Sequence, residues 1–295
     1  MRTIPLNFPK SVLIETSNIC HGKCLFCPYS EIKRGQKKEF LDYRLIEKML
    51  NEISNYFVER VSLFNNNDPL LDKRIYDIVK LAHGILPNVE LTLSTNGQHL
   101  TKSKIERLFN EGLSTLYISI PTLDKDAYQK IMGYELDKVL NIIDSIDNLK
   151  LLKMVRIAVP ITNKLDIKRF DSYFGKRGIE VCSWFVEYKE NWNIKDKINE
   201  LVGFSKYIGP CDRPMDQAVI LSNGNMVICC RDWFEENVIG NVKKYTIYEL
   251  WHNKIMKYIQ NKIATQTYDD IKCCRTCSLN INCYKRLVIK NEIPT

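Results

Sequence analysis

Three cysteines near the start of the chain have the residue type and spacing best suited to chemistry. Cys20, Cys24 and Cys27 lie in a polar loop, separated by three and two residues, after an apolar run at 12–15. Three thiolates can hold three irons of a [4Fe–4S] cube and leave the fourth iron open. An open metal position can bind a substrate or cofactor directly, as in catalytic zinc sites. A zinc knuckle with His21 as an extra ligand is the alternative for this motif alone.

A second group of cysteines fills the last third of the chain. Its pattern is Cys211-x12-Gly224-x4-Cys229, followed after a gap by Cys274-x2-Cys277-x5-Cys283. Four thiolates would close a cluster to substrate, which favours electron transfer over substrate ligation. Such a site can also hold a small domain together by its binding energy, as structural zinc does. Both roles remain open for this group.

The composition indicates a globular chain for a reducing compartment. The 295 residues are 45% hydrophobic and 26% charged. Eleven is an odd number of cysteines, so they cannot all form disulfides, and in a chain without a secretory signal they indicate metal binding or redox chemistry instead. No run of 18 apolar residues predicts a membrane span, and residues 1–10 lack the apolar core of a secretory signal. We therefore expect a cytoplasmic protein without a membrane partner.

The formal charge of +8 comes from lysines spread along the chain, which is typical of a solvated basic surface. No nucleic-acid-binding motif of a known kind is present, so no nucleic-acid partner is expected. A zinc- or cluster-bearing nucleic-acid-binding or sensor protein remains the alternative from a different class. Finding zinc without iron in the purified protein would favour it.

Strands and helices alternate up to about residue 188. Period-2 runs predict six strands, and period-3.6 runs predict the helices between them. The predicted strands are 12–15, 61–64, 89–95, 116–120, 154–160 and 179–186, and the predicted helices are 39–57, 71–86, 102–110, 125–132, 136–145 and 166–174. Ser103 and Glu106 are a possible capping box. This α/β order predicts a parallel sheet with the cysteine loop at the carboxyl ends of its strands.

The pattern changes after a polar linker at 189–210. Strands at 217–221 and 226–230 flank Asn223-Gly224, a strong hairpin signal. Thr246 and Glu249 form a capping box that opens a helix reaching about residue 262. We therefore divide the chain into a core domain, 1–205, and a smaller domain, 206–295, built from a β-hairpin, a helix and the second cysteine group.

The first cysteine motif, just after a strand, resembles that of the radical SAM superfamily. The resemblance implies a partial (β/α)6 TIM-like barrel and a cluster whose open iron is chelated by S-adenosylmethionine (SAM), which is cleaved reductively to a 5′-deoxyadenosyl radical. The second group resembles the SPASM extension of such enzymes, or its shorter form, twitch. Twitch holds one auxiliary [4Fe–4S] cluster, and this implies Cys211, Cys229, Cys274 and Cys277 as its ligands, hence two clusters in all.

The same resemblance implies a set of SAM-binding residues. Phe26 would lie near the adenine. Asn67 and Asp68 stand where the family has the Gly-Glu of Gly-Gly-Glu-Pro, which holds the methionine amino group. Asparagine tolerates left-handed backbone better than most residues, so the loop survives this departure. Polar contacts to the ribose and the methionine carboxylate are expected from four further residues: Asn96, Ser119, Lys130 and Arg156.

The implied activity is that of an enzyme, a radical SAM oxidoreductase or epimerase. Its expected substrate is a sugar or aminocyclitol, and modification or epimerisation of a ribosomal peptide is the alternative. Cys230 and Cys182 are candidate hydrogen-atom donors for an epimerase. A flavodoxin or ferredoxin is the expected electron donor, and the basic run Lys33, Arg34, Lys37 and Lys38 is either its docking place or an ordinary exposed loop.

Overall fold

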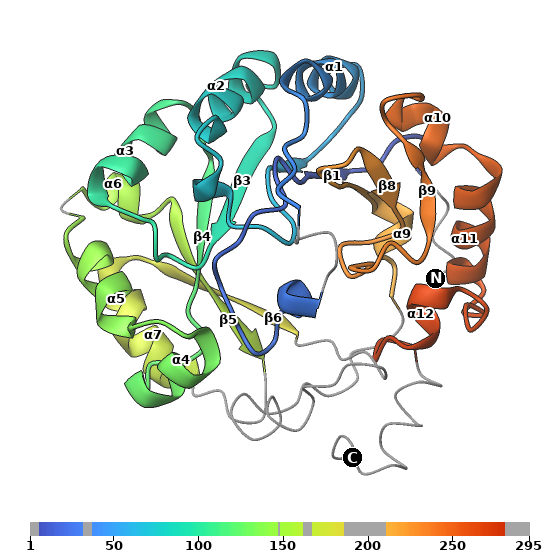
Figure 1. The fold of residues 1–295 in the computed structure, drawn as a ribbon. Coiled ribbons are helices and arrows are strands. Elements are labelled where there is room, and N and C mark those ends of the chain that lie inside the picture. Colours follow the sequence, from blue (N-terminus) through green and yellow to red (C-terminus); the bar gives the residue numbers. More distant parts are fainter. Residues whose placement is uncertain (1–5, 32–36, 147, 162–166, 186–210, 281–295) are drawn as a thin grey trace, which may run out of the picture.

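A nine-stranded sheet organises the whole chain. The computed structural model describes residues 6–31, 37–146, 148–161, 167–185 and 211–280. The strand order is β6-β5-β4-β3-β2-β1-β7-β8-β9, and neighbouring strands from β6 to β7 are all parallel. Figure 1 shows this sheet curving around an open centre, with the helices outside it. The predicted α/β fold with a partial barrel is therefore confirmed.

The element bounds agree with the sequence pattern to within a few residues in most of the barrel. The strands are β1 Ser11–Ile14, β2 Arg60–Ser62, β3 Glu90–Thr95, β4 Thr115–Ser119, β5 Val155–Ile161, β6 Glu180–Phe185, β7 Gln217–Ile220, β8 Asn225–Val227 and β9 Val238–Asn241. The helices are α1 Tyr43–Ile53, α2 Ile75–Ile85, α3 Lys102–Asn110, α4 Lys125–Met132, α5 Leu136–Asp144, α6 Leu149–Leu152, α7 Ile167–Phe174, α9 Arg213–Asp216, α10 Ile247–Trp251, α11 Lys254–Ala264 and α12 Lys272–Arg275. Short 3-10 turns are η1 Pro28–Glu31, η3 Pro69–Leu71 and η4 Gly175–Arg177.

The two faces of the sheet differ because side chains alternate along each strand. In β1, Val12 and Ile14 are fully buried in the hydrophobic core that the outer helices share. Ser11 and Leu13, between them in sequence, line the inner face instead. The same alternation in β2 to β6 gives an apolar outer layer and an inner face that mixes hydroxyl groups with aromatic and aliphatic side chains. The barrel therefore has its core outside the sheet and space for a ligand inside it.

The C-terminal extension continues the sheet of the core. β7 pairs in parallel with β1, and β8 pairs antiparallel with β7, which confirms the predicted hairpin. Gly224 in the connection has a φ of +89°, which suits glycine. β8 ends at Val227, before the predicted end at 230, so Cys229 and Cys230 lie in the turn that follows.

Two predicted helical features are wrong, and local capping explains both. The single helix expected over 246–262 is two helices, because the side chain of Asn253 accepts a hydrogen bond from the Met256 backbone and starts α11 separately. The cap of α3 is Thr101, which accepts from the Lys104 backbone, rather than Ser103. The capping box of Thr246 and Glu249 at α10 is confirmed.

Some sequence predictions fall outside the described residues. They include the linker at 189–210, the boundary at 205 and 206, and three single residues, Lys33, Arg34 and Cys283. The division into two domains therefore stays a prediction. Among the described residues, no helix is both long enough and apolar enough to cross a membrane.

Candidate active site

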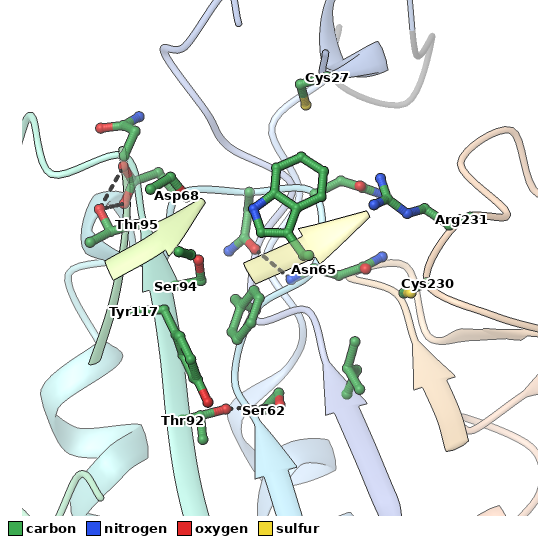
Figure 2. Close-up of a pocket in the computed structure, with 18 of the residues that line it drawn as sticks. Cys27, Ser62, Asn65, Asp68, Thr92, Ser94, Thr95, Tyr117, Cys230 and Arg231 are labelled. Carbon is green, nitrogen blue, oxygen red and sulfur yellow. Dashed lines mark hydrogen bonds between the residues drawn. The ribbon is translucent and has the colours of Figure 1, made fainter. Parts of the chain in front are cut away.

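A cavity of about 560 Å³ occupies the inner face of the barrel. It reaches from Ser62 and Thr92, whose hydroxyl oxygens lie 2.9 Å apart, to the cysteine loop at the carboxyl ends of the strands. In Figure 2, Cys27 lies at one end, while Cys230 and Arg231 approach from the extension. This volume is in the range of small-molecule sites.

The structure brings all three N-terminal cysteines to this cavity. A Cβ atom built on Gly22 would lie 3.3 Å from the Cys20 sulfur and 3.4 Å from the Cys24 sulfur, so both thiols face one small space over a residue without a side chain. The Gly22 backbone N–H donates to the Cys20 sulfur at 3.2 Å. The loop is anchored by the hydroxyl of Tyr29, which accepts from the Cys20 N–H at 2.9 Å.

The raised pKa values of these thiols suit a site that binds a positively charged metal centre. Burial raises the pKa of Cys20 to about 12, with smaller contributions from Cys27 and Asp68. Burial also raises the pKa of Cys24, and Cys27 and Cys20 raise it further. Three thiolates this close repel one another unless a positive centre lies between them, and a coordinating metal removes thiol protons outright. The donor set therefore suits an iron–sulfur cluster, which the three cysteines would hold.

The loop after β2 places Asp68 beside this site. Asp68 is 1% exposed and its carboxylate accepts from the Thr95 hydroxyl at 3.0 Å and from the Leu70 backbone at 3.1 Å. Burial raises the pKa of Asp68, although these hydrogen bonds oppose the effect. A buried carboxylate of this kind would gain from a ligand cation such as an ammonium group.

Asn67, in the same loop, offers an unused donor. Its side-chain oxygen accepts from the Asn65 backbone at 3.0 Å, which fixes the orientation of the amide. Asn67 lines the cavity, and its buried amide nitrogen meets no protein acceptor among the described residues. Buried donors without partners are costly, so a ligand acceptor belongs here. The Asn65–Asp68 loop thus fits a ligand that carries both a cation and an acceptor, as the amino-acid end of SAM does.

The remaining predicted SAM-binding residues fall into two groups. Phe26, Asn96 and Ser119 line the cavity. Lys130 does not; it lies exposed on α4. Arg156 points to the opposite, amino-terminal end of the strands, where it pairs with Glu180 at 2.9 Å and Glu90 at 3.7 Å. Lys130 is exposed and does not line the cavity, and Arg156 forms its ion pairs at the other end of the strands. The structure therefore does not bring either residue to the site.

The sequence analysis predicted Phe26 at this site but none of the other aromatic residues that line the cavity. The Phe26 and Trp184 rings meet edge to face at 5.4 Å between centroids. The Arg231 guanidinium carbon lies 5.6 Å from the Trp184 centroid and 5.3 Å from that of Trp233. Side chains alternate along β6, so Trp184 lies on the same face as Cys182, and this alternation could have predicted Trp184 at the cavity. Arg231 and Trp233 come directly after Cys229 and Cys230 in the sequence, and nothing local indicates that they reach the barrel.

The second cysteine group also converges. Burial raises the pKa of Cys211, and Cys229 and Cys277 raise it further, so these thiols are near neighbours. Cys229 is buried, with 8% of its surface exposed. The Cys277 backbone N–H donates to the Cys274 carbonyl at 3.1 Å, so Cys274 and Cys277 lie on the same turn. A buried thiol set of this composition fits an auxiliary cluster, although the ligand assignment stays a prediction.

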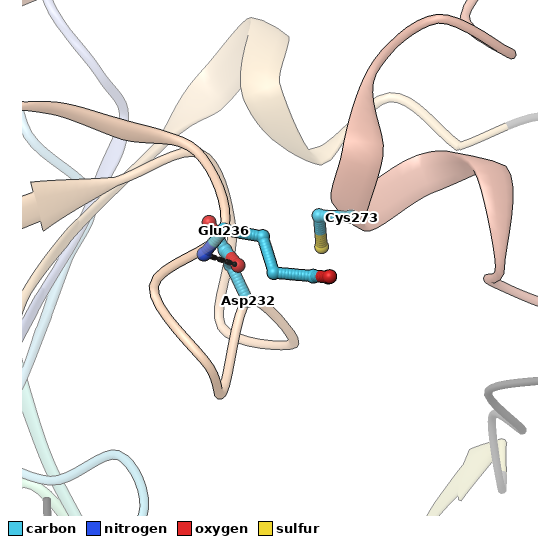
Figure 3. Close-up of side chains that lie close together, drawn as sticks. All are labelled: Asp232, Glu236 and Cys273. Atoms are coloured by element: carbon cyan, nitrogen blue, oxygen red, sulfur yellow. Dashed lines mark hydrogen bonds between the residues drawn. The ribbon is translucent and has the colours of Figure 1, made fainter. Parts of the chain in front are cut away.

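Cys273 contacts the loop at 231–237. Its sulfur lies within 4.8 Å of the nearest carboxylate oxygens of Asp232 and Glu236 (Figure 3). Asp232 is engaged by the backbone, since it accepts from the Glu236 N–H at 2.9 Å and from the Asn237 N–H at 3.0 Å. The Asn237 side chain in turn accepts from the Cys273 backbone at 2.8 Å. These contacts close the 232–237 loop onto α12.

The two hydrogen-donor candidates lie at the cavity in different settings. Both Cys182 and Cys230 line it. The Cys182 thiol donates to the Glu180 carboxylate at 3.4 Å, and burial, with that carboxylate, raises the pKa of Cys182 to about 11. Cys230 packs against the small apolar cluster of Leu13, Val219, Leu221 and Val227. Both thiols are thus placed to meet a ligand in the barrel.

Comparison with known families agrees with this geometry. Residues 14–170, more than half of the chain, match the model of the radical SAM superfamily. The chain therefore belongs to the radical SAM superfamily. Residues 211–278 match the SPASM model, an iron–sulfur cluster-binding domain. The protein is a radical SAM enzyme whose cofactors are SAM and iron–sulfur clusters, which sets aside the zinc alternatives.

Individual relatives cover different shares of the chain. A SAM-dependent 2-deoxy-scyllo-inosamine dehydrogenase of Niallia circulans is 22% identical over 270 residues, covering 90% of this chain and 91% of that protein. A GTP 3′,8-cyclase of Aliarcobacter butzleri is 26% identical over 189 residues, which is 62% of this chain and 56% of the cyclase. The first similarity thus includes the extension region, while the second spans little more than half of the relative.

Solved structures show the same fold. The structure of BtrN in complex with AdoMet and 2-DOIA has a TM-score of 0.70 at 17% identity and covers 93% of this chain and 94% of its own. SuiB of Streptococcus suis bound to SAM has a TM-score of 0.66 at 18% identity, covering 94% of this chain and 72% of its own.

Proposed function

We propose that this enzyme oxidises a secondary alcohol of a small polyhydroxylated substrate, of the sugar or aminocyclitol class, to a ketone. The observation that carries the proposal is the cavity, which holds the N-terminal cysteines at one end and receives residues of the extension at its side. The end-to-end similarity to a dehydrogenase of an aminocyclitol supports the same reaction class.

The size and lining of the cavity favour a small substrate over a folded peptide. Hydroxyl groups of Ser62, Thr92, Ser94 and Ser119 line the barrel interior, opposite the aromatic wall of Phe26 and Trp184. Hydroxyls donate and accept, so they suit a polyol, while aromatic faces suit the C–H side of a ring. A volume of about 560 Å³ is in the range of pockets that bind small molecules.

The chain's own groups would hold and orient the reactants. Cys20, Cys24 and Cys27 would bind the cluster, and Asp68 and Asn67 would bind the amino-acid end of SAM. When bound, these cofactors supply a carbon radical that removes a hydrogen atom from a substrate C–H bond. The substrate radical must then lose one proton and one electron to become a ketone, so an electron acceptor is needed. The cysteines of the extension would hold such an acceptor, and Cys230 of this group lines the cavity.

Epimerisation is the second candidate, and a specific observation favours it. Cys182 and Cys230 both line the cavity, and the raised pKa of Cys182 keeps its S–H bond intact at neutral pH. A protonated thiol can return a hydrogen atom to the opposite face of a substrate radical. In that case the product has the composition of the substrate, and the thiyl radical left on the cysteine must regain one electron from the reductant and one proton from solvent.

The test is anaerobic incubation with SAM, a reductant and a panel of sugars, aminocyclitols and peptides, followed by measurement of 5′-deoxyadenosine. A cyclitol or sugar deuterated at the reacting carbon should pass deuterium to 5′-deoxyadenosine and yield a ketone three mass units lighter than the deuterated substrate. A product only one mass unit lighter than the deuterated substrate, with inverted configuration, would select epimerisation. Stimulation by a peptide alone would overturn the small-substrate proposal.

A further inference from the structure

The carboxylate of Glu15 joins the two halves of the site. Glu15 follows β1 directly, five residues before Cys20, and is fully buried. β1 lies between β2 and β7 in the sheet, so the residue after its carboxyl end has one neighbouring loop on each side. One neighbour is the Asn65–Asp68 loop after β2. The other is the turn at 221–224 that begins the hairpin of the extension.

Glu15 contacts both loops through its two carboxylate oxygens. One oxygen accepts from the Asn66 backbone N–H at 3.1 Å, and the other accepts from the Ser222 backbone N–H at 3.1 Å. The Glu15 backbone N–H donates to the Ile220 carbonyl at 2.9 Å, which fixes the chain on the β7 side. A buried carboxylate with both oxygens engaged is strongly held, since hydrogen bonds to charged groups are stronger than neutral ones.

Each of the two loops leads directly to the chemistry. Asn66 precedes Asn67 and Asp68, the predicted SAM contacts, and the Asp68 N–H donates to the Ile19 carbonyl, next to Cys20. The turn that contains Ser222 begins the hairpin that carries Cys229 and Cys230. The position of one carboxylate therefore sets the position of both loops relative to the cavity.

We propose that Glu15 is a positioning residue that couples the SAM-binding loop to the extension hairpin. Occupation of the loop by SAM then orders the hairpin turn as well, and the hairpin in turn favours the loop geometry that binds SAM. The inference rests on the proposed assignment of the Asn65–Asp68 loop to SAM. It adds a role for a residue that meets neither cluster nor SAM directly.

A matched control exists in α1. Glu52 also joins the core to the extension through a carboxylate, accepting from the backbone N–H groups of Ile247 at 3.0 Å and Tyr248 at 2.8 Å. It contacts the start of α10 rather than the cavity loops. Glu15→Gln and Glu52→Gln therefore make the same chemical change at two contacts between the same parts, and only the first touches the SAM loop.

The experiment measures SAM binding and amide exchange in the cluster-loaded protein, with iron content checked for each variant. In Glu15→Gln, an amide N–H replaces one acceptor oxygen and faces a backbone donor, so the dissociation constant for SAM should rise about tenfold. Glu52→Gln should stay within about twofold of the wild type. SAM should slow amide exchange at both 65–68 and 221–224 in the wild type and in Glu52→Gln, but only at 65–68 in Glu15→Gln.

Three outcomes separate the alternatives. Wild-type SAM affinity and retained SAM-dependent protection at 221–224 in Glu15→Gln would overturn the coupling, as would equal weakening in Glu52→Gln. Unchanged SAM affinity in Asp68→Asn would instead overturn the assignment of the loop to SAM. If Glu15→Gln does not fold, amide exchange of the wild-type protein is compared with and without SAM. Exchange at 221–224 that SAM does not slow would then contradict the proposal.

Discussion

At the scale of single residues, the site is a set of thiols that burial holds in the protonated form. Cys20, Cys24 and Cys211 all have pKa values well above the usual range because they are buried and lie near other cysteines. In the absence of metal they are therefore poor nucleophiles and poor ligands. Binding of iron must displace their protons, so cluster assembly is expected to become more favourable as the pH rises.

The two cysteine groups should be separable by mutation. Cys24→Ala removes one of three predicted ligands of the SAM-binding cluster, so SAM cleavage should fall to background. Cys229→Ala should remove only the auxiliary cluster, lower the iron content by about half and leave SAM cleavage measurable. Iron analysis and 5′-deoxyadenosine measurement check both. Continued SAM cleavage by Cys24→Ala would contradict the ligand assignment.

Cys182 should react slowly with alkylating agents at neutral pH. Burial and the hydrogen bond to Glu180 raise its pKa to about 11, so its thiolate fraction at pH 7 is about a hundredfold below that of an ordinary cysteine. Mass-spectrometric mapping of iodoacetamide labelling should show a rate that rises about tenfold per pH unit up to pH 10.

Glu180→Gln is the control for Cys182. It removes the carboxylate that contributes to the raised pKa, so labelling at pH 7 should be faster than in the wild type. A wild-type labelling rate that is already independent of pH between 7 and 9 would contradict the protonated thiol.

At the scale of the elements, short caps and close approaches set where the helices lie around the sheet. Asp42, Thr101, Asp124 and Asn253 each accept a backbone N–H at the start of a helix, which fixes its first turn. The helices then cover the outer face of strands whose inner residues line the cavity. Loss of a cap that shifted a helix would therefore also shift the ends of the strands it covers and the loops that carry the cysteines.

Gly112, between α3 and β4, should not tolerate a side chain. Its φ is +102°, and a Cβ atom there would lie 2.2 Å from Cγ of His83 on α2. Gly112→Ala should lower the free energy of unfolding by about 2 kcal/mol through backbone strain and overpacking. Urea unfolding followed by circular dichroism measures this.

Gly84, within α2, is the matched control because a Cβ atom there would meet nothing within 4 Å. Gly84→Ala should stabilise the protein by about 0.5–1 kcal/mol, since alanine favours the helix. Equal effects of the two substitutions would contradict the role given to the close approach at Gly112.

At the scale of the whole molecule, core and extension share one sheet. β7 continues the barrel beside β1, and α10 is held to α1 through Glu52, so the cysteines of the extension are carried to the side of the cavity. This arrangement brings residues from both cysteine groups to one cavity. It is the geometry that an oxidation needs when one electron must leave the substrate after hydrogen-atom removal.

The anaerobically purified protein should contain about eight irons and matching sulfide per chain, as expected for two [4Fe–4S] clusters. Zinc should be low. About four irons, even after reconstitution, would contradict a second [4Fe–4S] cluster and leave the extension as a structural or zinc-bound element. The measurement needs no substrate and is independent of the reaction proposed.

The sequence by itself determined the family, the strand and helix order and the cysteine motifs, because these depend on local spacing and on periodicity along the chain. Phe26, Asp68, Asn96 and Ser119 reach the cavity as predicted, since each belongs to a strand end or to the cysteine loop. Residues at the carboxyl ends of parallel strands share one edge whatever the details of packing.

Only the tertiary structure decided which remote residues meet. Arg156 was expected at the SAM site, but pairing with Glu180 and Glu90 holds it at the other end of the strands. Arg231 and Trp233 reach the barrel because β7 pairs with β1, and Glu15 joins two loops 51 and 207 residues away for the same reason. Such contacts depend on the order of strands in the sheet, which no local pattern of the chain encodes.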